Sequence, residues 1–235
     1  MGILHCHTVA ALLLLLTFGL LETKLFAQSD TDFQVWNETT LVFPVIKQKD
    51  EKGKEFDRLS LLIFGTLRLG QNRLYPTDGR LGAGFDFKIN KYLNFTPTYL
   101  YRRAEPVNNR PEYEHRVRFD LTVGDKWEHF SIKDRSRVEY RIRNSRANSV
   151  RYRNKFTFTV PVNSDGKEVF APFISDEPYY DFHEKEWTTN DFSVGIGRKL
   201  TKNTSAEFFY LRRDVTNGAI RHINAIGVNL KIRID

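Results

Sequence analysis

Apolar and polar residues alternate along most of the chain after residue 33, and the alternation has a period of two. Between residues 116 and 123, apolar residues occupy every odd position and polar residues every even position. Residues 137–143 and 228–234 alternate in the same way. Because successive side chains of a β-strand point to opposite faces, each segment predicts a strand with one apolar and one charged face.

The alternation predicts eleven strands, and most of them reach the roughly 9–11 residues that a tilted strand needs to cross hydrocarbon. Bacterial single-chain barrels have an even number of strands. We therefore expect an all-β fold, a transmembrane antiparallel up-and-down β-barrel of about 10–12 strands. The predicted strands are 33–43, 59–69, 80–89, 93–102, 115–123, 130–143, 150–160, 169–179, 191–200, 205–213 and 224–234.

The links between these strands differ in length from one end of the barrel to the other. Tight turns rich in Gly, Asn and Asp are expected at one end, and longer polar loops at the other. This contrast is typical of outer-membrane barrels, whose long loops face outside the cell. The turns are 90–91, 124–126, 163–166 and 201–203, and the loops are 71–79, 103–114, 144–149, 181–190 and 214–221.

Aromatic residues cluster near both sets of strand ends. Amphipathic rings prefer the two membrane interfaces, so we expect two aromatic girdles on the barrel exterior. The loop-end set is Tyr99, Tyr101, Tyr113, Tyr140, Tyr152, Tyr179, Trp187 and Tyr210, and the turn-end set is Phe43, Phe87, Tyr92, Phe95, Trp127, Phe130, Phe158 and Phe170.

The N-terminus has the features of an export signal. An apolar run over Val9–Leu21 is too short to span a bilayer as a helix, and Ala27 before Gln28 is a plausible cleavage point. We expect residues 1–27 to be a signal peptide and residues 28–235 to form one barrel domain. Cys6 is the single cysteine and lies within the predicted signal peptide. The processed chain would therefore use neither disulfides nor thiolate chemistry.

The composition of the chain limits which classes of partner it can have. With 28% charged residues the chain is too polar for a helical membrane protein, whereas a barrel has one wet face on every strand. A net charge of +7 would ordinarily raise nucleic acid as a partner. Here the basic residues alternate along strands of an exported chain, which favours outer-membrane lipids as the partner and excludes nucleic acid.

If the apolar face meets lipid, the charged face lines the lumen. A basic ladder is expected there, and ten bases face three acids once Lys133 and Arg143 are included. The ladder is Arg116, Arg118, Arg135, Arg137, Arg141, Arg151, Arg153 and Lys155, and its acidic partners are Asp120, Glu139 and Glu177.

Two interpretations of this ladder are open. Cross-strand ion pairs would fill and brace a narrow barrel, because about eight strands are just filled by side chains. Alternatively, the excess of positive charge would attract anions, making the lumen a narrow conduit or binding site for small anionic solutes.

No other group of residues predicts chemistry. His115, His129, His183 and His222 lack metal-ligand spacing, and no strand serine has a histidine that can be placed beside it. We therefore expect a non-enzymatic protein without metal or cofactor.

Two alternatives are an outer-membrane enzyme acting on lipid or lipopolysaccharide, and a soluble secreted carrier. In the carrier the faces would reverse, with Phe119, Leu121 and Tyr140 lining a dry cavity.

Several short motifs carry a family resemblance. They are FQVWNE at 33–38, INKYL at 89–93, RVEYR at 137–141, YRNK at 152–155, SDE at 175–177 and YDF at 180–182. With these motifs the processed chain resembles the bacterial family catalogued as domain of unknown function 2490. The resemblance implies an outer-membrane β-barrel of unassigned activity and brings no catalytic residues.

Overall fold

The computed structural model describes residues 30–234 except 52, 54, 73 and 106–110, so the predicted signal peptide lies outside the described residues. In the described part of the chain, no helix is long and apolar enough to cross a membrane. The strands are β1 (Thr31–Lys49), β2 (Glu55–Gly70), β3 (Tyr75–Lys88), β4 (Leu93–Ala104), β5 (Glu112–Lys126), β6 (Ser131–Arg143), β7 (Ser149–Thr159), β8 (Val162–Ser164), β9 (Lys167–Asp181), β10 (Glu186–Lys199), β11 (Thr204–Val215) and β12 (His222–Arg233).

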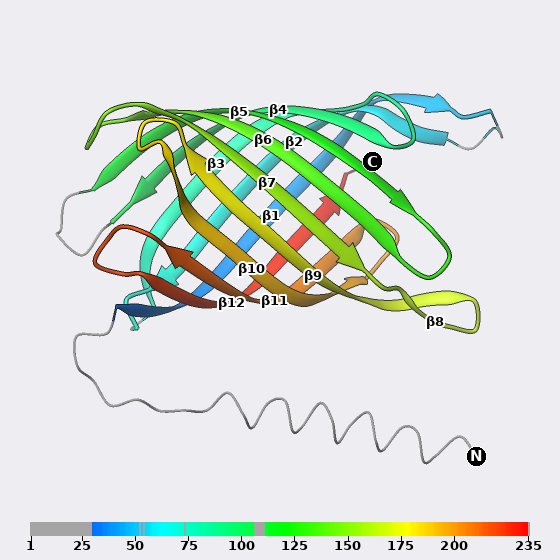
Figure 1. The fold of residues 1–235 in the computed structure, drawn as a ribbon. Helices are drawn as coiled ribbons and strands as arrows, with labels where there is room; N and C mark the ends of the chain where they lie inside the picture. Colours follow the sequence, from blue (N-terminus) through cyan, green and yellow to red (C-terminus); the bar gives the residue numbers. More distant parts are fainter. Residues whose placement is uncertain (1–29, 52, 54, 73, 106–110, 235) are drawn as a thin grey trace, which may run out of the picture.

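All strands except the short β8 form one closed barrel (Figure 1). Neighbours in sequence pair antiparallel around the ring, whereas β1 and β12 close it by pairing parallel, from Thr31 with His222 to Val42 with Arg233. The predicted β-barrel is confirmed, but its closing pair is not antiparallel. With eleven alternating wall strands, the first and last must run in the same direction.

The contrast between short turns and long loops is weaker than predicted. The end of the barrel that holds the start of β1, called the loop end here, has links of 71–74, 105–111, 144–148, 182–185 and 216–221. The opposite end, called the turn end, carries the β8–β9 hairpin with its Asp165–Gly166 turn, where both residues have positive φ. The predicted loops are shorter because polar residues such as Asp78, Glu114 and Asp181 continue the strands.

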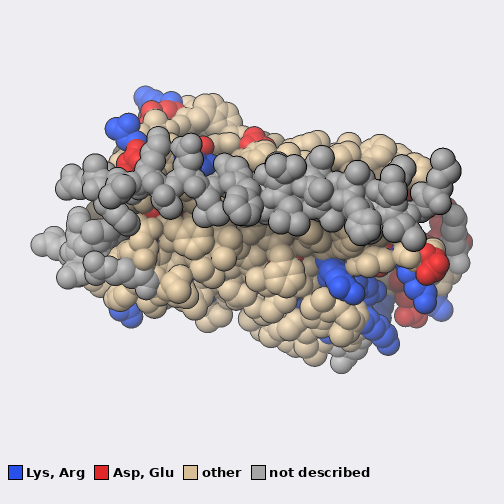
Figure 2. Space-filling model, turned by 90° about the horizontal axis from the view of Figure 1, so that it is seen from below, with Lys and Arg blue, Asp and Glu red and all other residues tan. Residues whose placement is uncertain are grey.

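The exterior is apolar and the interior is charged. On β5, Phe119 is 48% exposed whereas its neighbour Arg118 is 9% exposed. Leu121 and Tyr140 are exposed like Phe119, which is opposite to the soluble-carrier alternative. In Figure 2, charged side chains gather toward the two ends of the barrel and an uncharged surface lies between them. Such a band is what a transmembrane barrel presents to lipid.

Outward-facing aromatic rings contact one another near both ends. At the loop end, Tyr101 stacks on Tyr113, and Tyr180 meets Trp187 edge to face. At the turn end, Trp127 and Phe158 both contact Phe130. One member of the predicted girdle is wrong, because Tyr179 is only 3% exposed and its hydroxyl donates to Asp191 in the lumen.

Placing a charge at mid-height on the exterior tests this orientation. Phe119 lies at the centre of β5, so Phe119→Arg is expected to lower the free energy of unfolding by about 2–4 kcal/mol in lipid vesicles. The control is His115→Arg on the same strand, which contacts Tyr99 and Tyr101 at the loop end and should cost about 0–1 kcal/mol. Urea unfolding followed by gel mobility measures both, and equal effects would contradict the assignment of the exterior.

Candidate functional site

The predicted basic ladder lines the lumen, mostly in ion pairs. Ladder residues on β5, β6 and β7 alternate with outward apolar residues, so they project to the same interior face. The buried members are Arg116, Arg118, Arg137, Arg141 and Arg153, with Asp120, Glu139 and Glu177. Arg135, Arg151 and Lys155 are half-buried.

Glu139 is the centre of this network and is 0% exposed. Its carboxylate accepts from Arg151 at 2.6 Å and from Arg153 at 3.1 Å. Arg116 and Arg137 each place a guanidinium nitrogen 3.9 Å away. A buried carboxylate is stable only when charged donors replace its lost water, and four arginines meet that need.

The other two predicted acids are also paired. Arg137 donates to Asp120 through two nitrogens, at 2.6 and 2.5 Å, in the bidentate geometry that guanidinium groups favour. Glu177 lies 2.6 Å from Arg135 and 2.8 Å from Arg153.

Further acids that the sequence did not indicate enter the lumen. Glu114 contacts Arg116 at 2.6 Å and Arg141 at 2.5 Å. Asp78 pairs with Arg80 and Arg102, Asp181 shares Arg141 with Glu114, and Asp191 pairs with Arg213. The lumen therefore holds more acids than the three expected, because Asp78, Glu114 and Asp181 lie at strand ends that had been assigned to loops.

We call this arrangement the ion-pair lattice. It comprises Arg80, Arg102, Arg116, Arg135, Arg137, Arg141, Arg151, Arg153, Asp78, Glu114, Asp120, Glu139, Glu177 and Asp181.

Two lumen arginines have no carboxylate within ion-pair distance among the described residues. Arg118 donates to the Thr98 hydroxyl at 2.9 Å and lies over the Phe64 ring. The Arg68 guanidinium stacks 3.5 Å above the Trp36 ring, and its buried Nε has no hydrogen-bond partner in the described part of the chain. The Arg68 guanidinium thus lacks a carboxylate partner among the described residues.

Part of the remaining lumen wall is apolar. Trp36 on β1, Leu211 on β11 and Ala225 on β12 form a buried cluster, against which Phe209 and Ile223 pack. The lumen therefore has a densely charged wall on β3–β7 and β9 and an apolar cluster beside the parallel β12–β1 pair, with Asp32 and Arg213 next to it.

Below the loop end, a layer of buried side chains fills the barrel. Nearly every wall strand contributes an inward side chain, and on β3 the Phe64 ring from β2 occupies the space that Gly82 leaves. We call these residues the buried layer: Trp36, Phe64, Leu100, Arg118, Glu139, Arg153, Tyr179, Ser193, Leu211 and Ala225.

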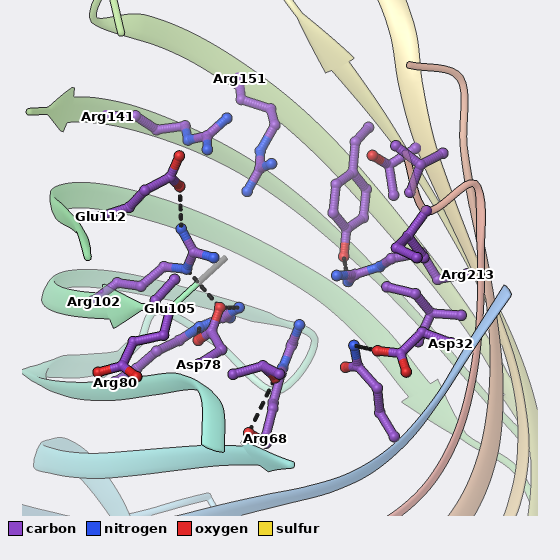
Figure 3. Close-up of a pocket in the computed structure, with 18 of the residues that line it drawn as sticks. Asp32, Arg68, Asp78, Arg80, Arg102, Glu105, Glu112, Arg141, Arg151 and Arg213 are labelled. Carbon is purple, nitrogen blue, oxygen red and sulfur yellow. Dashed lines mark hydrogen bonds and ion pairs between the residues drawn. The ribbon is translucent and has the colours of Figure 1, made fainter. Parts of the chain in front are cut away.

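A pocket of about 440 Å³ opens above this layer at the loop end (Figure 3). Its lining contains nine arginines and four carboxylates. The ladder residues Arg118, Arg135, Arg137 and Lys155 do not line it. The arginines are Arg68, Arg80, Arg102, Arg116, Arg141, Arg146, Arg151, Arg153 and Arg213, and the carboxylates are Asp32, Asp78, Glu105 and Glu112.

Sequence reasoning missed five of these arginines. Arg68 lies between Leu67 and Leu69 in a predicted strand, so its alternation was a usable signal. Arg80, Arg102 and Arg213 lie at ends of predicted strands, where the pattern fades, and Arg146 lies in a predicted loop.

The pocket-lining carboxylate of Glu105 is held by two hydrogen bonds. The Tyr75 hydroxyl donates to Glu105 at 2.7 Å, and Arg103 donates to the same carboxylate at 2.7 Å. These bonds, the tyrosine first, hold the pKa of the Glu105 carboxyl below its ordinary value. Glu105 is therefore ionised at neutral pH, and Arg103 balances its charge. The described residues contain no group of His, Cys, Asp and Glu placed to hold a metal ion.

Comparison with known proteins gives the family. The model of a protein family of unknown function, DUF2490, matches residues 33–224. The chain belongs to the DUF2490 family. The resemblance seen in its motifs is thereby confirmed.

Two solved structures resemble this DUF2490 barrel distantly. LpxR from Salmonella typhimurium is 10% identical, covering 76% of this chain and 83% of that chain, with a TM-score of 0.41. An anion-selective porin from Comamonas acidovorans is 9% identical, covering 77% and 59% respectively, with a TM-score of 0.37. Neither likeness carries information on function at these values. No curated protein matches the sequence.

The lattice predicts an unequal cost for removing two acids from this DUF2490 protein. Glu139→Gln leaves four guanidinium groups without their shared charge, and should lower the free energy of unfolding by about 3–5 kcal/mol. Glu168→Gln removes an exposed pair with Lys126 and should cost about 0–1 kcal/mol. Urea unfolding in detergent micelles measures both changes, and a Glu139→Gln variant as stable as the control would contradict the lattice.

Proposed function

We propose that this DUF2490 protein is a non-enzymatic barrel of the bacterial outer membrane that binds small anionic solutes in the loop-end pocket. The observation that carries the proposal is the pocket lining, with nine arginines against four carboxylates. Guanidinium groups are suited to carboxylate and phosphate ligands because they offer several donors in a planar array.

The availability of donors supports binding more than net charge does. An acid of the lattice can pair with several arginines. Glu114, for example, forms ion pairs with Arg116, Arg141 and Arg102, the last at 3.4 Å. An arginine has five N–H donors and a carboxylate accepts only a few of them. Arg68 lines the pocket and has no carboxylate within ion-pair distance in the described chain, so an entering anion would be its first direct ionic partner.

Binding is favoured over passage because of the buried layer. A conduit needs a continuous wet path, whereas Leu100 and Glu139 below the pocket are almost completely inaccessible. Eleven strands also suit a filled barrel, since open aqueous channels are typical of about 16–18 strands.

The outer membrane is the proposed location, with its lipids as the surrounding partner. The apolar exterior of the closed barrel supports a membrane, and the predicted signal peptide at residues 1–27 supports export. An enzyme acting on lipid or lipopolysaccharide would need a nucleophile beside a base. The lumen serines Ser175 and Ser193 bond to each other instead, at 3.4 Å, which favours the non-enzymatic proposal.

Anion binding is measurable by titration calorimetry on the folded barrel in detergent. Inorganic phosphate and benzoate are the anionic probes, and benzylammonium is a cation of similar size to benzoate. At least one anion should bind and benzylammonium should not. Arg68→Met should weaken anion binding about tenfold or more, because a hydrogen bond to a charged group contributes about 1.5–3 kcal/mol.

The matched control is Arg58→Met, an exposed arginine at the turn end that donates to the backbone carbonyls of Lys88 and Ile89. It should leave affinity unchanged. Absence of binding by both anions, or equal effects of the two substitutions, would refute the proposal.

Planar-bilayer recording separates binding from passage. We expect no steady conductance from the wild-type barrel, because the buried layer closes the lumen. A steady anion-selective current would contradict the binding assignment and favour a conduit.

A further inference from the structure

One wall of the loop-end pocket is apolar, which constrains the ligand beyond its charge. Val215 ends β11, Ile223 begins the inward face of β12, and Ile220 lies in the link between them; all three line the pocket. Ile223 also packs against the cluster of Trp36, Leu211 and Ala225. The apolar surface therefore continues from the pocket into the buried layer.

Arginines of the pocket lie across it from the apolar residues, but Asp32 and Arg213 flank Ile223 on the neighbouring strands. The Asp32 carboxylate accepts from the Gln34 amide and from the backbone N–H groups of Gln71 and Asn72, so its charge is held within the protein. Figure 3 shows Arg80, Arg102 and Arg141 across the pocket from Arg213. Arg213 is the cross-strand neighbour of Ile223, and two of its nitrogens lie 2.6 Å from Asp191, so its charge is already matched. The apolar side consequently adds little free positive charge.

The pocket is also larger than an inorganic ion requires. About 440 Å³ falls in the range of small-molecule sites, roughly 300–1,000 Å³. A water molecule, which is comparable to a small ion, occupies about 30 Å³ of liquid. A bare ion held by the arginines would leave water against the side chains of Val215, Ile220 and Ile223, which offer it no hydrogen bond.

We infer that the ligand is an amphipathic organic anion, whose carboxylate or phosphate group meets the arginines and whose apolar body packs against Val215, Ile220 and Ile223. The inference rests on the proposed anion binding and adds the ligand class. Burial of apolar ligand surface against this wall supplies affinity that acetate or inorganic phosphate does not gain.

The test compares anions that share a carboxylate and differ in apolar body. Titration calorimetry on the full barrel with benzoate, acetate and inorganic phosphate should give a dissociation constant for benzoate at least about tenfold below those of the other two. Ile223→Asn should reduce the benzoate advantage to less than about threefold and leave acetate affinity unchanged. Ile223→Leu, which keeps an apolar side chain of equal size, should preserve it.

Ile220→Asn provides a second variant in case Ile223→Asn fails to fold, because Ile220 lies in a link outside the strands. Trp36 lies directly against the Arg68 guanidinium. Its fluorescence, with Trp127 and Trp187 replaced by Phe, gives an independent readout of ligand binding at Arg68.

The inferred ligand class and the proposed function can fail separately. If acetate and phosphate bind as tightly as benzoate and depend on Arg68, the ligand class is overturned and anion binding stands. The ligand class is also overturned if benzoate still binds at least about tenfold more tightly than acetate in both Ile223→Asn and Ile220→Asn. If no anion binds, or Arg68→Met changes nothing, the proposed function fails as well.

Discussion

The structure depends on one constraint: carboxylates enclosed in a narrow barrel must be neutralised by the strands around them. Glu139 has no exposed surface, and arginines from β5, β6 and β7 surround it. Uncompensated charge in such a place would cost several kcal/mol. The lattice therefore fixes which residues face the lumen. Because side chains alternate along a strand, it also fixes which residues face outward. The lipid-facing apolar band follows from the same register.

The need to neutralise buried carboxylates also explains why the middle of the lumen is filled whereas its loop end holds a pocket. Where acids and arginines match, as between Asp120 and Arg137, the side chains close the lumen. Toward the loop end arginines outnumber the acids that line the pocket. The apolar residues near the parallel β1–β12 pair lie beside Asp32 and Arg213, whose side chains already have hydrogen-bond partners. A pocket with guanidinium donors on one side and isoleucines on another results. Its composition suits an anion with an apolar body.

The period-two pattern predicted the barrel, the inward phase of Arg116 and Arg137, and the apolar exterior, because alternation is a local property of each strand. Pairing between distant strands is not local. The parallel closure, the shorter loops and the inward Glu114 all depend on it, since a polar residue at a strand end looks like a loop residue. Tyr179 and Tyr180 are adjacent, so aromatic character alone did not decide which of them faces lipid.

A double-mutant cycle on Arg137 and Asp120 tests the lattice most directly. The variants are Arg137→Met, Asp120→Leu and the double substitution, with unfolding free energies measured by urea titration in detergent. The buried bidentate pair predicts a coupling free energy of about 2–3 kcal/mol. Each single variant leaves the partner's charge buried without its counter-ion, whereas the double variant removes both charges. A coupling below about 0.5 kcal/mol would contradict an interior organised by buried ion pairs.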